Sequence, residues 1–171
     1  MKIRTIVATA VVAIVLAQPA SAFWLYQKHE SAFDDGALHV AFSAAVGANP
    51  GGLGVRCKDG KAEIMYIVMD SGLTSNDANN ANKIGAMKLK MRIDKGEIKD
   101  YPVHSSVNDD KYIMVFDIDR SVAEQMRDAK KSISVTASLA GQNFWENTFS
   151  VTGSTDVIGK TLALCDSSAT N

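Results

Sequence analysis

Alternating apolar and polar positions run through most of the chain and predict short β-strands. Residues 86–93 show the period of two most clearly, with apolar side chains at Met87, Leu89, Met91 and Ile93 and basic ones at Lys88, Lys90 and Arg92. Successive side chains of a strand point to opposite faces, so such a segment buries one face and exposes the other. The same reasoning predicts strands over 37–45, 53–57, 63–69, 97–103, 112–118, 132–139 and 143–151.

The segment 63–69 departs from this alternation because it is apolar at every position after Glu63. Ile64, Tyr66 and Val68 would occupy one face of the strand, and Met65, Ile67 and Met69 the other. A strand that is apolar on both faces is expected at the centre of a sheet. We therefore predict that 63–69 is a central strand that is covered on both sides.

Turn signals separate the strands. Lys58-Asp59-Gly60, Asp94-Lys95-Gly96, Asn108-Asp109-Asp110 and Gly141-Gln142 each stand between two predicted strands. Short connections of this kind join antiparallel neighbours. Residues 23–36 show no clear period, and the polar, Asn-rich segment 70–83 is expected to be a mobile exposed loop.

Two segments have the helical period instead. Asp119 or Ser121 can cap a helix that runs to about Lys130, and Ser154 or Thr155 can cap a last helix that contains Cys165. The whole pattern predicts a mostly β fold, an antiparallel β-sandwich or barrel-like domain with two short α-helices.

The N-terminus has the form of a secretory signal peptide. Lys2 and Arg4 precede an apolar run over 6–17, and Ala20-Ser21-Ala22 provides the small residues that signal peptidase requires. We expect cleavage before Phe23, which leaves 23–171 as a single periplasmic domain. The run is shorter than the roughly 20 residues of a membrane-spanning helix, so no stable membrane anchor is expected after cleavage.

Charge argues against nucleic acid as a partner. The full chain has 18 basic and 19 acidic residues, and two of the basic ones, Lys2 and Arg4, belong to the predicted signal peptide. The remaining 16 basic residues against 19 acidic ones give a net charge near −3. Such a chain has no general attraction for phosphate.

The chain contains two cysteines, Cys57 and Cys165, and no Cys-x-x-Cys motif. In an oxidising compartment an even number of cysteines favours a structural disulfide over a redox or metal site. The bridge would join an early strand to the last helix. Two free thiols or an intermolecular bridge are the alternatives.

Residues for catalysis or cofactor binding do not form a recognisable motif. None of His29, His39 and His104 accompanies a glycine-flanked serine, and His39 is expected to be solvated. The acidic pairs Asp34-Asp35 and Asp109-Asp110 stand in turns, and Asp59 and Asp94 are expected to make turn hydrogen bonds. We predict no enzymatic activity, no cofactor and no metal site.

The methionines offer one alternative to that view. Met65 with Met69, and Met87 with Met91, share faces of their strands, and thioethers can bind Cu(I) in a periplasm. The simpler interpretation is that they fill the core, because Met packs adaptably against other apolar side chains.

Two groups of residues are candidates for a binding surface. Trp24 and Tyr26 lie close to the expected mature N-terminus, and aromatic residues are enriched among interface hot spots. Lys88, Lys90 and Arg92 form a basic row that could meet an anionic glycan or lipid from a sheet edge. The alternatives are that Trp24 packs across the open end of the sandwich and that the basic row is a solvated face that discourages edge pairing.

The order of several short motifs resembles a known family. A Trp after the signal peptide is followed by Ser31-Ala32-Phe33-Asp34-Asp35, Arg56-Cys57-Lys58-Asp59-Gly60, Met91-Arg92-Ile93-Asp94, Asn108-Asp109-Asp110, Phe149-Ser150-Val151-Thr152-Gly153 and a last helix with Cys165. This arrangement is similar to the type VI secretion-associated periplasmic proteins of the VasI or TagO type, although the Asn-rich segment 70–83 departs from their pattern. A fainter resemblance is to the invasion-associated locus B proteins, which usually carry more cysteines.

The resemblance implies an accessory role in a secretion machine without an established enzymatic activity. We therefore expect an exported binding protein that presents a sheet surface to an envelope or secretion-system protein. An inhibitor of a cell-wall hydrolase, similar to a lysozyme inhibitor, is the alternative function, with 70–83 as the segment that would insert into the enzyme's cleft.

Overall fold

The computed structural model describes residues 23–30, 37–45, 49–58 and 60–168, and these residues form two antiparallel sheets and three helices. The larger sheet has the order β1 (Leu25–Glu30), β2 (Ala37–Ala44), β3 (Gly51–Lys58), β4 (Lys61–Met69), β8 (Lys111–Asp117) and β7 (His104–Asn108). The smaller sheet has the order β10 (Gln142–Ser150), β9 (Ser132–Leu139), β5 (Met87–Ile93) and β6 (Lys99–Pro102). The helices are α1 (Ser75–Ile84), α2 (Arg120–Asp128) and α3 (Ser154–Ser168).

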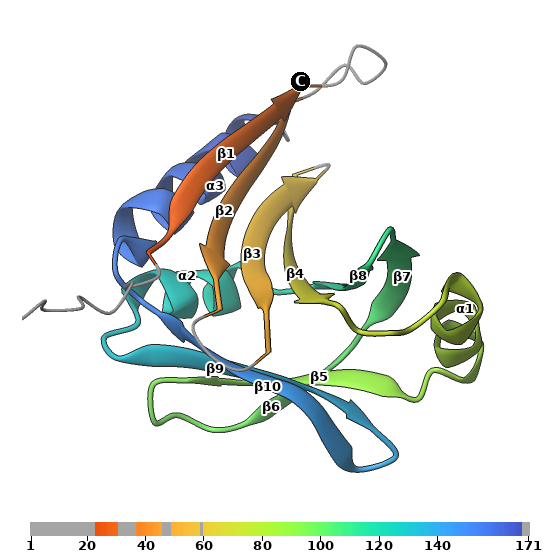
Figure 1. Ribbon diagram of the computed structural model, residues 1–171. Helices are drawn as coiled ribbons and strands as arrows, with labels where there is room; N and C mark the ends of the chain where they lie inside the picture. Colours follow the sequence, from red (N-terminus) through yellow and green to blue (C-terminus); the bar gives the residue numbers. More distant parts are fainter. Residues whose placement is uncertain (1–22, 31–36, 46–48, 59, 169–171) are drawn as a thin grey trace, which may run out of the picture.

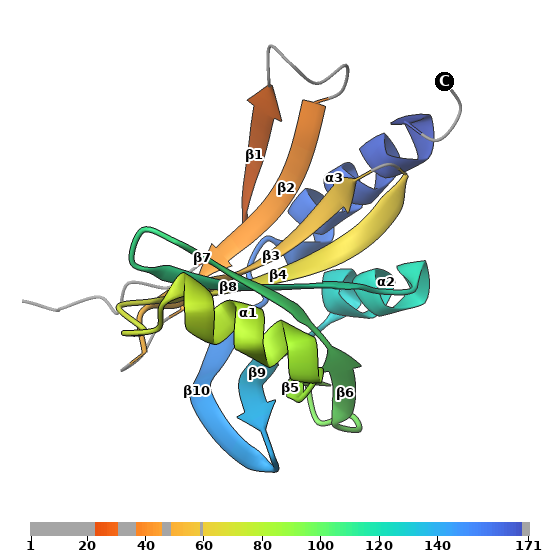
Figure 2. The same cartoon turned by 90° about the vertical axis from the view of Figure 1, so that its right-hand side faces the viewer.

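The predicted mostly β, sandwich-like class is confirmed. Figure 1 shows the six-stranded sheet above the four-stranded one, with the strands of the two sheets running in different directions. In Figure 2, α2 and α3 lie on the same side of the six-stranded sheet. The hydrophobic core fills the space between that side and the second sheet, and its largest fully buried side chains include Tyr66, Tyr112 and Phe149.

The prediction of a mobile loop over 70–83 is wrong, because this segment contains α1. Thr74 and Asp77 form a reciprocal capping box, and Gly85 ends the helix in the left-handed conformation at φ 58°. Asn82 then fixes the helix to β7 by accepting from the Ser105 N–H and donating to the Ser105 carbonyl, both at 2.7 Å. The fold therefore has three helices and not the two expected.

The strands also differ from the sequence expectation, because β1 and β7 were not predicted and β6 is shorter than expected. Residues 25–30, which show no period of two, form strand β1 along β2. The predicted strand over 97–103 is shorter, since β6 ends at Pro102 and Val103 separates it from β7. β6 pairs with β5 and β7 pairs with β8, so the chain passes from one sheet to the other at Val103.

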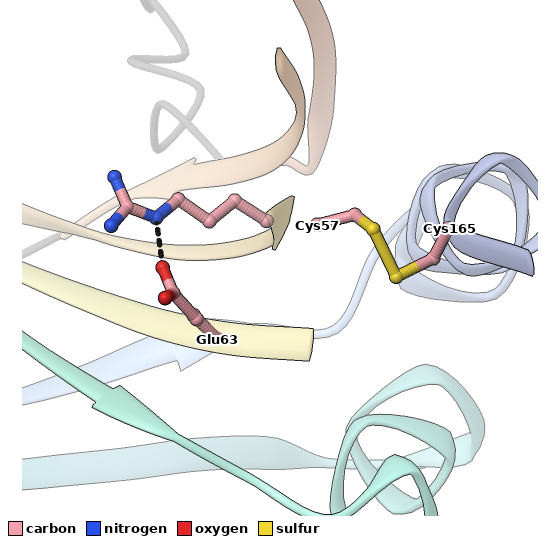
Figure 3. Close-up of a disulfide and its surroundings, with 4 residues drawn as sticks. Cys57, Glu63 and Cys165 are labelled. Atoms are coloured by element: carbon pink, nitrogen blue, oxygen red, sulfur yellow. Dashed lines mark hydrogen bonds and ion pairs between the residues drawn. A yellow bond between two sulfur atoms is a disulfide. The ribbon is translucent and has the colours of Figure 1, made fainter. Parts of the chain in front are cut away.

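The predicted disulfide is present. Cys57 of β3 and Cys165 of α3 are bonded, with their Cα atoms 5.3 Å apart, and both side chains are buried. The bond fastens the last helix to the six-stranded sheet, as Figure 3 shows.

Candidate binding surfaces

Trp24 is part of the core and not of an exposed surface. Its side chain is 2% exposed, and its indole N–H donates to the Ser150 carbonyl at 2.8 Å. Its backbone N–H donates to the Thr152 carbonyl at 3.0 Å. The structure therefore agrees with the alternative interpretation, in which Trp24 packs at the end of the sandwich. In this position its side chain and backbone join the start of β1 to the end of β10.

Tyr26 is partly buried and faces α3. Its hydroxyl lies 2.6 Å from Nδ1 of His39, and Nζ of Lys160 lies 3.7 Å from the centre of its ring. His39, predicted to be solvated, is partly exposed and has Tyr26 as a partner under the last helix. The Tyr26 hydroxyl makes a hydrogen bond and the Tyr26 ring makes a cation–π contact, so this side chain stabilises the fold.

The basic row lies elsewhere, on the outer face of the four-stranded sheet. β5 is paired with β9 on one side and with β6 on the other, so the row does not lie at a sheet edge. Its side chains point away from the core because the alternate positions Met87, Leu89 and Met91 are buried. Lys88 and Arg92 are exposed, and the structure does not bring the row together with Tyr26 into one surface.

A different surface stands out, on the side of the six-stranded sheet that faces away from α2 and α3. Here Leu25 lies opposite Phe42, Phe42 opposite Gly54, Gly54 opposite Met65, and Met65 opposite Val115, so these five positions share one face. We call this the open face. Its apolar side chains are Leu25, Leu38, Val40, Phe42, Met65, Ile67, Met69, Ile113 and Val115.

Most of these apolar side chains are accessible to solvent. Leu25 is 47% exposed and Met69 is 40% exposed, whereas Ile64, Tyr66 and Val68 on the opposite side of β4 are fully buried. The prediction that 63–69 is central is correct, but the prediction that it is covered on both sides is wrong. Among the described residues, the helices and the second sheet pack only against the other side.

Two glycines of β3 shape the centre of the open face. A Cβ atom at Gly52 would lie 2.0 Å from Cζ of Phe42, which means that the Phe42 ring occupies the space above this glycine. Gly54 lies between Val40 and Met65. Beside them is a shallow hollow of about 520 Å³, whose apolar lining includes Leu38, Phe42 and Ile67. Because Gly52 and Gly54 have no side chains, the Phe42 ring can lie over Gly52, and a depression remains beside it in the apolar face.

Charged side chains lie at both ends of the open face: Lys111 lies opposite Met69 at one end, and Asp117 lies opposite Glu63 at the other. Nε of Arg56 pairs with Oε2 of Glu63 at 2.6 Å across β3 and β4, and Figure 3 shows this ion pair beside the disulfide. Next to it Lys58 lies directly opposite Lys61, and no described acidic side chain pairs with either lysine. Like charges directly opposite one another destabilise a sheet. The corner formed by Lys58 and Lys61 therefore favours an acidic neighbour.

The second sheet has a bulge in β10 that is held by buried polar groups. The register of β10 against β9 shifts between Phe144 and Asn147, and Trp145 has φ 52°. The Tyr66 hydroxyl donates to the Trp145 carbonyl and accepts from Nδ2 of Asn147 at 2.9 Å. Burial raises the pKa of Tyr66 to about 12, so its hydroxyl is protonated and able to donate at neutral pH. The network fixes the bulge from inside the core.

The histidines and acids do not gather into one site in the part of the chain that the structure describes, where no group of three or more His, Cys, Asp or Glu side chains could hold a metal ion. Asp110 pairs with Lys111 at 3.8 Å, while Asp34 and Asp35 lie outside the described residues. Asp94 does not use its carboxylate within its own turn as predicted: it accepts from the backbone N–H groups of Lys130, Lys131 and Ser132, and these hydrogen bonds lower the pKa of Asp94. Asp59 lies outside the described residues.

The methionine pairs differ from each other. Met87 and Met91 are buried, as the core interpretation requires, but Met65 is half-buried and Met69 is exposed on the open face. The sequence signal that could have located the open face is therefore the apolar row Met65, Ile67 and Met69 in the segment 63–69. Its exposure depends on which elements cover the sheet, and periodicity along one strand does not contain that information.

Comparisons with known proteins give a likeness of fold. The sequence matches no family model and no curated protein. The structure is similar to the crystal structure of invasion associated protein B from Bartonella henselae, with a TM-score of 0.54 and 10% sequence identity, over 84% of this chain and 93% of that one. None of the helices in the described residues is long and apolar enough to cross a membrane.

Proposed function

We propose that this chain is an exported, non-enzymatic binding protein of the bacterial envelope, an accessory of a type VI secretion system or a related envelope assembly. Its activity is to hold a protein partner against the open face of the six-stranded sheet. The mature protein is residues 23–171, and it works in the periplasm. No cofactor or catalytic residue is required for this role.

The observation that carries the proposal is the accessible apolar area of the open face. Large contiguous apolar patches on a protein surface mark interaction sites. The patch here extends over five neighbouring strands of one sheet, and the Cys57–Cys165 bond fastens the sheet to α3 from behind. A partner therefore meets a surface that needs little ordering on binding, which reduces the entropic penalty of association.

The charges on the open face define the chemistry of the partner. An apolar protein segment would cover Leu25, Phe42 and Ile67, and acidic residues at one end of that segment would meet Lys58 and Lys61. Opposite charges across an interface fix the orientation of the partner and raise the association rate. We therefore assign the face to an apolar segment with an acidic flank.

Three features support the compartment and the assembly. The residues before Phe23 have the pattern of a signal peptide, and a disulfide between the only two cysteines fits an oxidising compartment. The ordered motifs around Arg56–Gly60 and Phe149–Gly153 resemble the VasI or TagO type. The structural neighbour carries the name of an invasion associated protein, which is compatible with an accessory role at the cell envelope.

The alternative of a hydrolase inhibitor loses its structural basis. It required 70–83 to be a loop that inserts into a cleft, and this segment is largely the helix α1. The helix is fixed to β7 through Asn82 and Ser105, so it is not available as an extended inserting element.

The test compares variants of the open face with a matched control. Leu25→Ser and Ile67→Ser remove apolar area from the face, and Ile84→Ser removes an apolar side chain that is 71% exposed on α1. Tagged proteins are expressed with the signal sequence in a strain that lacks the gene and has a type VI system. Retained periplasmic proteins and delivery by the contractile machine are then measured for each variant.

The proposal expects that Leu25→Ser and Ile67→Ser lose both the partner and delivery while their melting temperatures stay within a few degrees of the wild type. Ile84→Ser keeps partner and delivery. Lys58→Glu/Lys61→Glu weakens retention of a partner with an acidic flank. If delivery is normal in the deletion strain, or if Ile84→Ser is as defective as the face variants, the proposal is wrong.

A further inference from the structure

The outer face of the four-stranded sheet contains a hollow that is separate from the open face. A hollow of about 260 Å³ lies over strands β5, β9 and β10 and the segment that leads into β6. Four charged side chains line it, Lys90 and Arg92 from β5, Asp100 from β6, and Glu146 from β10. Between them lie the polar side chains of Ser134 and Asn143.

The bulge in β10 brings Glu146 to this hollow. Phe144 lies opposite Ala137 and Asn147 opposite Val135, so Trp145 and Glu146 together occupy the length that Thr136 alone spans on β9. Trp145 packs towards Tyr112 in the core, and Glu146 is exposed on the outside. β-Bulges commonly re-aim side chains beside functional sites.

The bulge is stabilised at several points. Trp145 has a left-handed φ of 52°, a conformation that is unfavourable for a residue with a large side chain. Tyr66 and Asn147 bind it from the core, and the Thr136 hydroxyl donates to the Phe144 carbonyl at 2.9 Å. Strained backbone that is held in place by several hydrogen bonds is found mainly at active sites and ligand-binding sites.

The charged groups of the hollow are of both signs, yet they do not pair. Lys90 lies directly opposite Asp100 in the β5–β6 register, and Glu146 and Arg92 line the same depression. In the described part of the chain, none of these four side chains takes part in an ion pair within 4.0 Å. Two cations and two carboxylates thus remain available to a molecule that occupies the space between them.

We infer that this hollow binds a carboxylate-bearing saccharide. Lys90 and Arg92 would hold the carboxylate of the sugar, because the guanidinium and ammonium groups donate charge-assisted hydrogen bonds. Asp100 and Glu146 would accept hydrogen bonds from sugar hydroxyls, and Ser134 and Asn143 would add polar contacts. Ile98, which is 50% exposed at the rim, offers an apolar surface to the C–H groups of a ring.

Other small ligands satisfy this set of groups less well. A simple anion would meet Lys90 and Arg92 but would be repelled by Asp100 and Glu146. A neutral saccharide would leave both cations without a partner. A peptide of mixed charge could pair with all four groups, but it offers few hydroxyl donors to Asp100 and Glu146, which lie on opposite edge strands of the sheet.

The experiment uses matched ligands on the mature protein. A galacturonate trimer, a galactose trimer of the same linkage, N-acetylmuramic acid, acetate and a short Lys/Glu peptide are titrated against ¹⁵N-labelled protein. Amide shifts of residues that line the hollow report binding. The inference expects saturable shifts at Arg92, Ser134 and Glu146 with at least one of the two acidic saccharides, and binding at least about tenfold weaker for the neutral trimer.

Variants separate the site from general charge attraction. Arg92→Gln and Glu146→Gln should each weaken binding by about tenfold. Lys88→Gln is the control, because Lys88 belongs to the same basic row but does not line the hollow. It should bind as the wild type does, and so should the open-face variant Ile67→Ser.

Several results would overturn the inference. These are the absence of saturable shifts with both acidic saccharides, equal binding of the neutral trimer, equal shifts with acetate alone, tighter binding of the peptide, or the same loss in Lys88→Gln as in Arg92→Gln. The outcome is independent of the proposed protein partner, since Ile67→Ser alters the other sheet.

Discussion

The hydroxyl of Tyr66, in the centre of the six-stranded sheet, donates to the backbone carbonyl of Trp145, in the bulge of the four-stranded sheet. Tyr66 is fully buried and also accepts from Asn147, so one phenol group joins the two sheets through a polar network inside the core. The contact fixes the conformation of β10 at the point where Glu146 turns outward. A buried polar group of the core thus helps to determine the shape of the outer surface.

Replacing Tyr66 tests the importance of this network for stability. Tyr66→Phe keeps the ring but leaves the Trp145 carbonyl and the Asn147 amide without their partner, and a buried unsatisfied group costs about 1–3 kcal/mol. We expect a loss of this size in the free energy of unfolding, measured by urea denaturation. Tyr101→Phe is the control, because Tyr101 is partly exposed and packs by its ring against Phe116, and it should change stability by less than about 0.5 kcal/mol.

Tyr66 should also give the protein a distinct alkaline limit. Burial raises its pKa from 10.0 to about 12 in the folded state. A raised pKa favours the folded state fully below pH 10, and this contribution is lost as the pH rises from 10 to 12. The difference corresponds to at most about 3 kcal/mol. Stability curves of wild type and Tyr66→Phe should therefore converge between these pH values, and curves that stay parallel would contradict the assignment.

The sequence predicted the parts of the fold that depend on local pattern. The period of two over 86–93 placed β5 correctly, and the even number of cysteines predicted the bond between Cys57 and Cys165. The sequence pattern did not predict helix α1, because asparagine has a weak helix propensity. The only local signal for the helix is the capping box formed by Thr74 and Asp77. The stability of the helix depends on contact with β7, which comes later in the chain.

The candidate surfaces were harder to predict for the same reason. Nothing local distinguishes Trp24 from an exposed aromatic residue, because its hydrogen-bond partners, the carbonyls of Ser150 and Thr152, lie more than 100 residues further along the chain. The apolar row that contains Met65 and Ile67 was visible in the sequence, but its exposure follows from the position of α2 and α3 on the opposite side of the sheet. The passage of the chain between the sheets at Val103 is likewise a property of the assembled fold.

Breaking the disulfide should destabilise the protein without changing its fold. The bond closes a loop with a sequence separation of 108 residues, and removal of such a bond costs about 2–5 kcal/mol. Cys57→Ser and Cys165→Ser should each lower the melting temperature by a similar amount. The double variant should be no less stable than either single one, because the two thiols act as a unit. A free-thiol assay on denatured, non-reduced wild type should find none, and two thiols per chain would contradict the bond.

The attachment of α1 to β7 depends on Asn82. Asn82→Ala removes two hydrogen bonds to the backbone of Ser105, which belongs to an edge strand. We expect a loss of about 1–3 kcal/mol in stability and faster amide exchange across residues 75–84. Asn79→Ala is the matched control, because Asn79 is exposed on the same helix. Equal exchange in the two variants would mean that the helix is held by Ala78 and its other apolar contacts alone.

Trp24 provides the sharpest distinction between packing and binding at the mature N-terminus. Trp24→Ala should cost about 3–5 kcal/mol because it removes a large side chain that is 2% exposed. Trp24→Phe retains part of the apolar contact but loses the hydrogen bond to Ser150, so its loss should be clearly smaller. Phe23→Ala is the control, since Phe23 is the neighbouring aromatic residue and is 53% exposed. Thermal unfolding and partner retention are measured for all three variants. If Trp24→Ala loses the partner while melting as the wild type does, Trp24 is a binding residue after all, and its burial against β10 does not describe the protein in solution.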